Sequence, residues 1–168
     1  MLDSLITSKT RLRLLIKFFL NIANKGYLNG LANEFGESTN SIRKELNNLS
    51  SAGYLEKFNE NNKVLYMANS SHPLFKVIQR IVKKHLGIEE ILETVLKRIG
   101  DVKKLIILGD YAEGIDSGHI EILIVGDNIS ENYLKEITPK IEKKINRKVS
   151  FFVSNSTLKQ KTLTIFEA

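Results

Sequence analysis

Residues 38–54 read STNSIRKELNNLSSAGY, and this stretch decides how the first half of the chain is interpreted. Its apolar residues recur at the spacing of one helical face: Ile42, Leu46 and Leu49. Ser38 is a favourable N-cap, and Gly53 suits the left-handed conformation that commonly follows a helix end. The stretch therefore predicts an amphipathic helix between these two residues.

The opposite face of this helix carries side chains suited to DNA. These are Asn40, Arg43, Lys44 and Asn47, with Ser38 and Ser41 at the helix start. Arginine can make a bidentate contact to guanine and asparagine to adenine, while lysine and serine can hold phosphates. Any amphipathic surface helix also has a polar stripe, so a merely solvated face is the alternative interpretation.

The flanking sequence predicts two earlier helices, over residues 8–24 and 28–35, and a β-hairpin of strands 54–58 and 63–67. A polar turn at 59–62 separates the strands, and Lys57 and Lys63 flank it, where they can reach the DNA backbone or minor groove. The first helix has two apolar lines, which favours a helix that is fully enclosed or shared with a partner subunit. This order of elements is that of a winged helix-turn-helix.

Residues 28–68 resemble the winged-helix regulators of the arsenic-repressor and multiple-antibiotic-resistance-repressor type. The matching segments are Leu31-Ala32, residues 38–42, 46–49, 52–56 (AGYLE) and 64–66 (VLY). The resemblance implies a winged helix-turn-helix, double-stranded DNA as the partner and a homodimer.

The second half predicts a connecting helix over 71–86, a further helix over 88–99, and three strands, at 105–108, 120–125 and 149–153. A loop over 109–118 separates the first two strands, and a helix broken or kinked at Pro139 precedes the third. Residues from 157 onward fit no element. The predicted domains are 1–70, 71–86 and 87–168, and the fold class is α+β.

The region around residues 87–153 resembles the minimal nucleotidyltransferases of the polymerase-beta superfamily, through Gly109, Tyr111, Ala112 and Gly114. The resemblance implies a small α/β domain with a serine after the first glycine, an Asp-x-Asp pair and a third carboxylate, which together hold two Mg²⁺ ions. Those positions hold Asp110, His119-Ile120-Glu121 and about Ser150. We therefore expect a degenerate site, at Gly109, Asp110, His119 and Glu121, with no catalytic residue, bound metal or cofactor.

Composition narrows the function classes further. Residues 1–70 and 71–100 each carry a net charge of +3, whereas residues 101–168 are neutral, so a polyanion is attracted to the first hundred residues. No cysteine is present, which excludes disulfides and thiol chemistry, and no apolar run predicts a membrane span. A cytoplasmic protein is expected.

These observations favour a sequence-specific DNA-binding transcriptional regulator with a catalytically inactive sensor or dimerisation domain. Whether that domain binds a small-molecule or nucleotide effector is left open by the sequence. The alternatives are an active Mg²⁺-dependent nucleotidyltransferase targeted by the winged helix, with Asp110, Asp116 and Glu121 as a rearranged metal site, and a protein-interaction scaffold.

Overall fold

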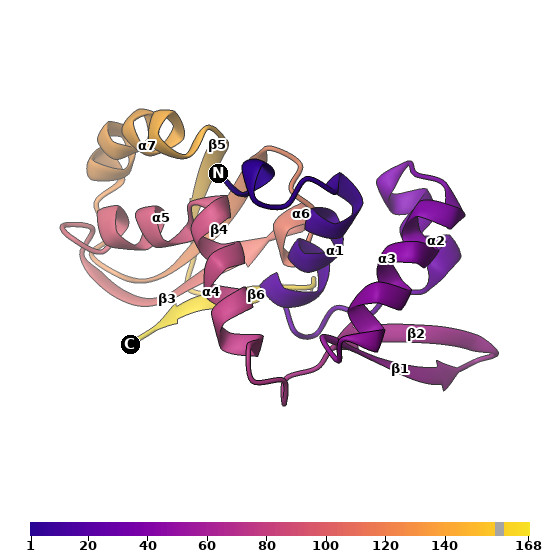
Figure 1. Cartoon of the computed structure of the whole chain (residues 1–168). Coiled ribbons are helices and arrows are strands. Elements are labelled where there is room, and N and C mark those ends of the chain that lie inside the picture. The colour runs from indigo at the N-terminus through magenta and orange to yellow at the C-terminus, as the bar shows by residue number, and fades with distance from the viewer. Residues whose placement is uncertain (157–159) are drawn as a thin grey trace. The chain divides into compact units, whose positions relative to one another are not determined.

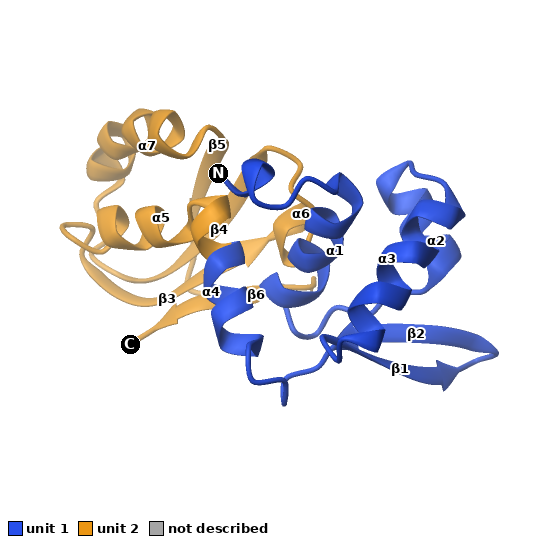
Figure 2. Cartoon of the chain, in the orientation of Figure 1, with its two compact units in different colours: residues 1–82 blue, residues 83–168 orange. Residues whose placement is uncertain are grey.

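The computed structural model describes residues 1–156 and 160–168, and it shows a mixed α+β chain. Two compact units, Met1–Val82 and Lys83–Ala168, make up the chain (Figure 2). The division falls inside helix α4 (Phe75–Leu86), within the segment predicted as a connecting helix. Residues 157–159 of the predicted second domain lie outside the described residues. In the described part of the chain, no helix has both the length and the apolarity that a membrane span requires.

Unit 1 contains the predicted order of three helices and a hairpin (Figure 1). After a short 3-10 turn at Leu2–Ser4, the elements are α1 (Lys9–Leu20), α2 (Leu28–Phe35), α3 (Thr39–Ser51), β1 (Leu55–Glu60) and β2 (Lys63–Ala68). The prediction of a first helix extending to residue 24 is wrong. Asn21 adopts an extended conformation, and its side-chain carbonyl accepts a hydrogen bond from the Ala23 amide at 3.1 Å, which turns the chain out of the helix.

The core of unit 1 is built around α1. Most residues of its two apolar lines are buried and Leu15 is half-buried, so unit 1 itself encloses most of this helix. The first turns of α4 cover it, because Phe75 packs against Phe19 and the Gln79 side chain donates to the Phe19 carbonyl at 3.2 Å. An exposed apolar row begins instead at Leu74, just before α4, and continues with Val77 and Ile81 on that helix.

The hairpin is tighter than the sequence predicts. Its strands pair from Leu55 with Ala68 to Glu60 with Lys63, which leaves only Asn61 and Asn62 in the turn. Both have positive φ, as a type I′ turn requires, and asparagine tolerates this conformation better than most residues. The predicted four-residue turn over 59–62 is therefore wrong, and Asn59 continues β1.

Unit 2 is a small mixed sheet with helices. Its elements are α5 (Ile88–Val95), β3 (Asp101–Leu108), α6 (Gly109–Ala112), β4 (His119–Asp127), α7 (Glu131–Ile145), β5 (Lys148–Val153) and β6 (Leu163–Glu167). The strands lie in the order β5-β4-β3-β6, with β4 parallel to β5 and β3 antiparallel to both of its neighbours. Helix α7 packs on β5 and against α5. The buried isoleucines of β3 and β4 form the centre of this sheet.

Three further expectations for unit 2 need correction. The helix expected over 88–99 ends at Val95, the loop expected over 109–118 begins with α6, and β6 forms in a segment that the sequence left unassigned.

The break expected at Pro139 does not occur, since α7 is one helix from Glu131 to Ile145 with the proline inside it. Proline leaves the carbonyl four residues earlier without its helical donor, and that carbonyl belongs to exposed Lys135, where water can replace the donor. The buried side chains of Ile137 and Ile141 hold the helix to the core on both sides of the proline.

Candidate nucleic-acid interface

Helix α3 presents one buried and one exposed face. Ile42, Leu46 and Leu49 are buried, whereas Asn40, Arg43, Lys44 and Asn47 are all exposed. Because these four polar residues recur at helical spacing, the structure brings them together in one row, which we name the α3 row. Within it, the Arg43 guanidinium donates to the Asn40 side-chain carbonyl at 3.1 Å. This bond restrains two of the side chains predicted to contact bases.

Ser38 starts the helix, as expected. Its hydroxyl accepts a hydrogen bond from the Ser41 amide at 3.3 Å, and the two hydroxyls lie 3.0 Å apart. Both serines are exposed at the end of α3 where free amide groups and the positive end of the helix dipole favour an anion.

Replacing Ser38 with alanine removes this cap, and we expect the free energy of unfolding of unit 1 to fall by about 1 kcal/mol. Denaturant titration of the full chain measures the loss. Ser38→Asp keeps a capping acceptor and is expected to retain most of the stability. Equal losses in the two variants would contradict a capping role.

The acidic side chains near α3 are already neutralised by cations of α1. Glu45 is buried and accepts from the Arg11 guanidinium at 2.8 Å and from the Ser8 hydroxyl at 2.9 Å.

The two acidic residues of α2 and the following turn are paired in the same way, Glu34 with Lys17 at 2.7 Å and Glu37 with Arg13. In contrast, neither Arg43 nor Lys44 has a carboxylate partner in the part of the chain that the structure describes. The positive charge of the α3 row is therefore not offset by local acids.

The two hairpin lysines differ in their surroundings. Lys57 is exposed on β1, opposite Tyr66, whereas the Lys63 ammonium lies 4.1 Å from the centre of the Tyr27 ring. Lys25, which the sequence analysis did not single out, makes a similar contact with Phe58 at 5.0 Å. Cation–π contacts of this kind hold the turn end of the hairpin to the segment just before α2 and keep the cations on the surface.

In unit 2, the degenerate nucleotidyltransferase-like residues are brought together only in pairs. Glu121 lies beside Gly109, because a Cβ atom on this glycine would collide with the Glu121 carboxylate. The His119 imidazole Nε2 lies 2.7 Å from the Ser150 hydroxyl, across the parallel strands β4 and β5. Asp110 is exposed in the first turn of α6.

The rearranged metal site is not formed. Asp116 is bound on both carboxylate oxygens by Arg147, at 2.8 and 2.7 Å, and also accepts from the Tyr111 hydroxyl. No group of three or more His, Asp or Glu side chains in the described residues is arranged to hold a metal ion. The residues present thus do not fit the two Mg²⁺ ions that the nucleotidyltransferase resemblance implies.

No local sequence pattern indicates the three-residue network of Tyr111, Asp116 and Arg147. Burial raises the pKa of the Asp116 carboxyl, but the hydrogen bonds from Arg147 and Tyr111 outweigh it and hold that pKa below its usual value. Burial and the neighbouring Asp116 carboxylate raise the pKa of Tyr111, so its hydroxyl stays protonated. The Tyr111 hydroxyl oxygen also accepts a hydrogen bond from the Gly118 amide at 3.0 Å. The network thereby fixes the segment between α6 and β4.

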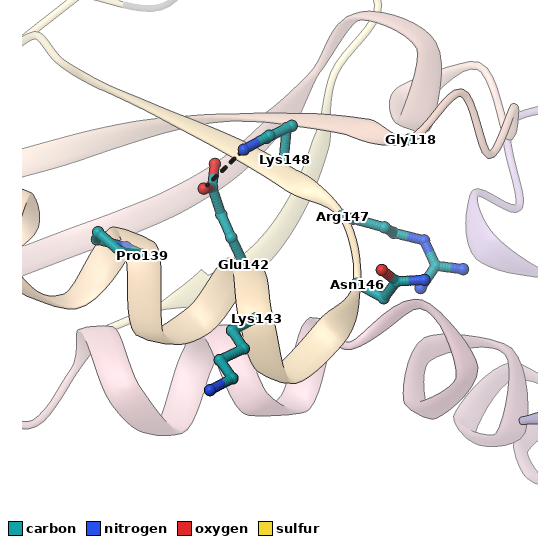
Figure 3. A pocket seen from close by; sticks show the side chains of 7 residues that line it. All are labelled: Gly118, Pro139, Glu142, Lys143, Asn146, Arg147 and Lys148. Atoms are coloured by element: carbon teal, nitrogen blue, oxygen red, sulfur yellow. Dashed lines mark hydrogen bonds and ion pairs between the residues drawn. The ribbon is translucent and has the colours of Figure 1, made fainter.

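A pocket of about 420 Å³ lies beside this network (Figure 3). Gly118 and the end of α7 line it together with the start of β5. Glu142 accepts from the Val149 amide at 2.9 Å and lies 3.4 Å from the Lys148 ammonium, while Arg147 points away from both. The hydrogen bond from the Val149 amide is the main reason that the pKa of Glu142 lies below its usual value. Two of the charged pocket residues, Glu142 and Arg147, are therefore bound by the chain itself.

Comparisons with known proteins give one distant structural similarity and no match to a family or a curated sequence. Among solved structures, the chain is similar to the crystal structure of the transcriptional regulator BldR from Sulfolobus solfataricus. The identity is 14%, the match covers 58% of this chain and 70% of that chain, and the TM-score is 0.39. A similarity at this level shows neither a family nor a function.

Proposed function

We propose that the chain is a sequence-specific DNA-binding transcriptional regulator, that unit 1 is a winged helix-turn-helix, and that the protein acts as a homodimer on double-stranded DNA. The observation that carries the proposal is the α3 row. Its four polar side chains are exposed together, its cations have no carboxylate partner in the described residues, and the nearby acids are paired with α1.

In this proposal α3 enters the major groove. Arg43 contacts a guanine, Asn40 and Asn47 contact adenines, and Lys44 with the two serines at the helix start holds phosphates. Lys57 and Lys63 bring the hairpin to the DNA backbone beside the groove. In a twofold dimer, the two copies of α3 would contact half-sites about one helical turn apart.

We further propose that unit 2 is a nucleotidyltransferase-like domain without catalytic activity, which acts as a sensor or strengthens the dimer. The Asp116 carboxylate, which Arg147 already binds, and the exposed Asp110, which has no ion-pair partner in the described residues, support the absence of catalytic activity. Incubation of the full chain with Mg²⁺ and labelled nucleoside triphosphates is expected to give no transfer. Label incorporation that disappears in Glu121→Ala would identify an active transferase instead.

Selection of bound fragments from random double-stranded DNA tests the main proposal. We expect an inverted repeat with half-sites about ten base pairs apart. Recovery of fragments without a common sequence would reduce the proposal to non-specific charge attraction. Failure to retain any DNA would favour the protein-interaction scaffold.

Salt dependence provides a second measurement. Each copy has three lysines proposed to bind phosphate: Lys44, Lys57 and Lys63. A dimer then makes about six phosphate contacts, and its affinity for DNA is expected to fall by about 10³-fold between 50 and 200 mM salt. Fluorescence anisotropy with the selected DNA measures this slope. An affinity that hardly changes with salt would argue against DNA as the partner.

A further inference from the structure

Helix α4 leaves one apolar row of unit 1 uncovered. The side of the helix that carries Phe75 is buried against α1. Leu74, Val77 and Ile81 lie on another side, and the Ile78 amide donates to the Leu74 carbonyl at 2.9 Å, which keeps Leu74 in helical register. The three side chains are 45%, 51% and 40% exposed. Single exposed apolar side chains are ordinary, but such a row along a helix is typical of a surface that contacts a partner.

A groove continues this row toward the rest of unit 1. Ile78 lies four residues after Leu74 and three before Ile81, so its half-buried side chain adjoins the row. Ile78 also lines a groove of about 320 Å³, together with Leu15 of α1 and Leu49 of α3. The other lining residues, none of them acidic, are Arg11, Asn48, Ala52 and Tyr54. We name the row and this groove together the α4 surface.

The outer edge of the α4 surface is basic. Arg80 lies three residues after Val77 and four after Lys76, so the two cations follow the row along the helix. The helix, FKVIQRIVKKHL, contains no Asp or Glu. Lys76 has no carboxylate partner in the part of the chain that the structure describes, whereas Lys84, at the end of the helix, is already paired with two glutamates of α5.

This combination of an apolar row and a basic edge selects among possible occupants. A second copy that used the same surface would bring its own basic edge, because a twofold contact places the same patch on both sides, and neither copy has an acid there to neutralise these cations. A nucleic acid would neutralise the cations but would bury phosphates against the apolar row, which costs free energy. The occupant that fits both parts is apolar along one side and acidic beside it.

We propose that the α4 surface docks an acidic amphipathic helix of another protein. The apolar side chains of that helix enter the groove and cover the row, and its carboxylates face Lys76 and Arg80. At about 1.5 Å per residue, the row rises about 10 Å from Leu74 to Ile81, which matches about two turns of the docked helix. The contact breaks no existing ion pair, because Lys84 and Arg11 keep their glutamates.

This inference goes beyond DNA binding and does not depend on it. Leu49 belongs to the buried face of α3, opposite the α3 row, so an occupant of the groove leaves the α3 row free. In a DNA-binding regulator, such a surface brings a second protein to the same DNA. A contact of two helical turns buries less than the roughly 800 Å² per partner of a standard stable interface, so the docking is weak and transient.

Fluorescence anisotropy with synthetic peptides and the full chain tests this inference. The probe is a labelled peptide of about fifteen residues, with leucines at helical spacing and glutamates beside them, and the comparison peptide has lysine in place of each glutamate. The unchanged chain is expected to bind the acidic peptide at least about tenfold more tightly than the basic one. Absence of binding to the acidic peptide, or equal binding of the two, would overturn the proposal.

Two exposed positions separate the apolar and the charged contributions. Val77→Asn is expected to weaken binding of the acidic peptide about tenfold, whereas Val64→Asn, the same change at an exposed valine of β2, leaves it unchanged. Lys76→Glu is expected to weaken the acidic peptide and strengthen the basic one, while Lys57→Glu, on β1, does neither. Equal effects of either variant and its control would overturn the proposal.

Hydrogen exchange of the unchanged chain gives a readout that does not depend on any variant folding. The α4 amides are expected to exchange more slowly in the presence of the acidic peptide, and protection confined to other elements would overturn the proposal. Sedimentation velocity without peptide tests the competing occupant. Val77→Asn is expected to sediment as the unchanged chain does, and a dimer that this variant alone dissociates would show that a second copy covers the α4 surface instead.

Discussion

Replacing Arg43 with alanine is expected to lower the affinity for the selected DNA by about 10- to 100-fold. A bidentate contact between arginine and guanine contributes about 1–3 kcal/mol of discrimination, and no neighbouring residue of the α3 row has the same pair of donors. Preference at the contacted base pair should relax in the same variant. Anisotropy titrations with the selected DNA and with a base-pair substitution at that position measure both effects.

Arg98 supplies the matched control for this prediction. It is an exposed arginine of unit 2, so Arg98→Ala makes the same change in net charge outside the proposed interface. We expect less than a twofold loss of affinity. Equal losses in the two variants would show that net charge alone, and not the α3 row, determines binding.

Replacing Asp116 with asparagine is expected to lower the free energy of unfolding of unit 2 by about 2–4 kcal/mol. The Asp116 and Arg147 side chains are only 26% and 14% exposed, so the variant leaves a partly buried guanidinium without its counter-charge. The Tyr111 hydroxyl also loses a charged acceptor. Hydrogen exchange of the β4 and β5 amides measures the loss within unit 2.

The same carboxylate makes this stability depend on pH. Because the pKa of Asp116 is lower in the folded chain than the value of about 3.9 in an unfolded one, its contribution is present above that value. The contribution is lost as the pH falls through the folded pKa. The unchanged chain should therefore lose more stability than Asp116→Asn when the pH is lowered below about 4.

Asp110→Asn is the control for both measurements. Asp110 is exposed, so this variant is expected to change stability by less than about 0.5 kcal/mol. If Asp110→Asn and Asp116→Asn are equally destabilised, the Arg147 pair does not stabilise unit 2.

Local sequence rules were enough for much of unit 1. The start of α3 followed from the serine N-cap, its inner face from three apolar residues at helical spacing, and the α3 row from the remaining polar positions. The turn of the hairpin was harder, because two adjacent asparagines in the left-handed conformation shorten it by two residues. The function of the α3 row stays a prediction.

Contacts between distant residues limited the prediction for unit 2. Asp116 and Arg147 are 31 residues apart, and nothing in the neighbouring sequence of either shows that they meet. Lys25 meets Phe58 in the same unpredictable way. Strand β6 is only five residues long and none of them is buried, and it forms because β3 offers it an open partner.

The strand order of unit 2 has a consequence for synthesis. Strand β3, with the run Leu-Ile-Ile-Leu at residues 105–108, lies between β4 and β6, and β6 is made from residues 163–167. During translation one side of this apolar strand therefore stays uncovered until residues 163–167 have left the ribosome. Unit 1, whose elements follow one another without such a delay, can complete its own core first. Newly made chains consequently pass through a period in which chaperone binding competes with aggregation at this one strand.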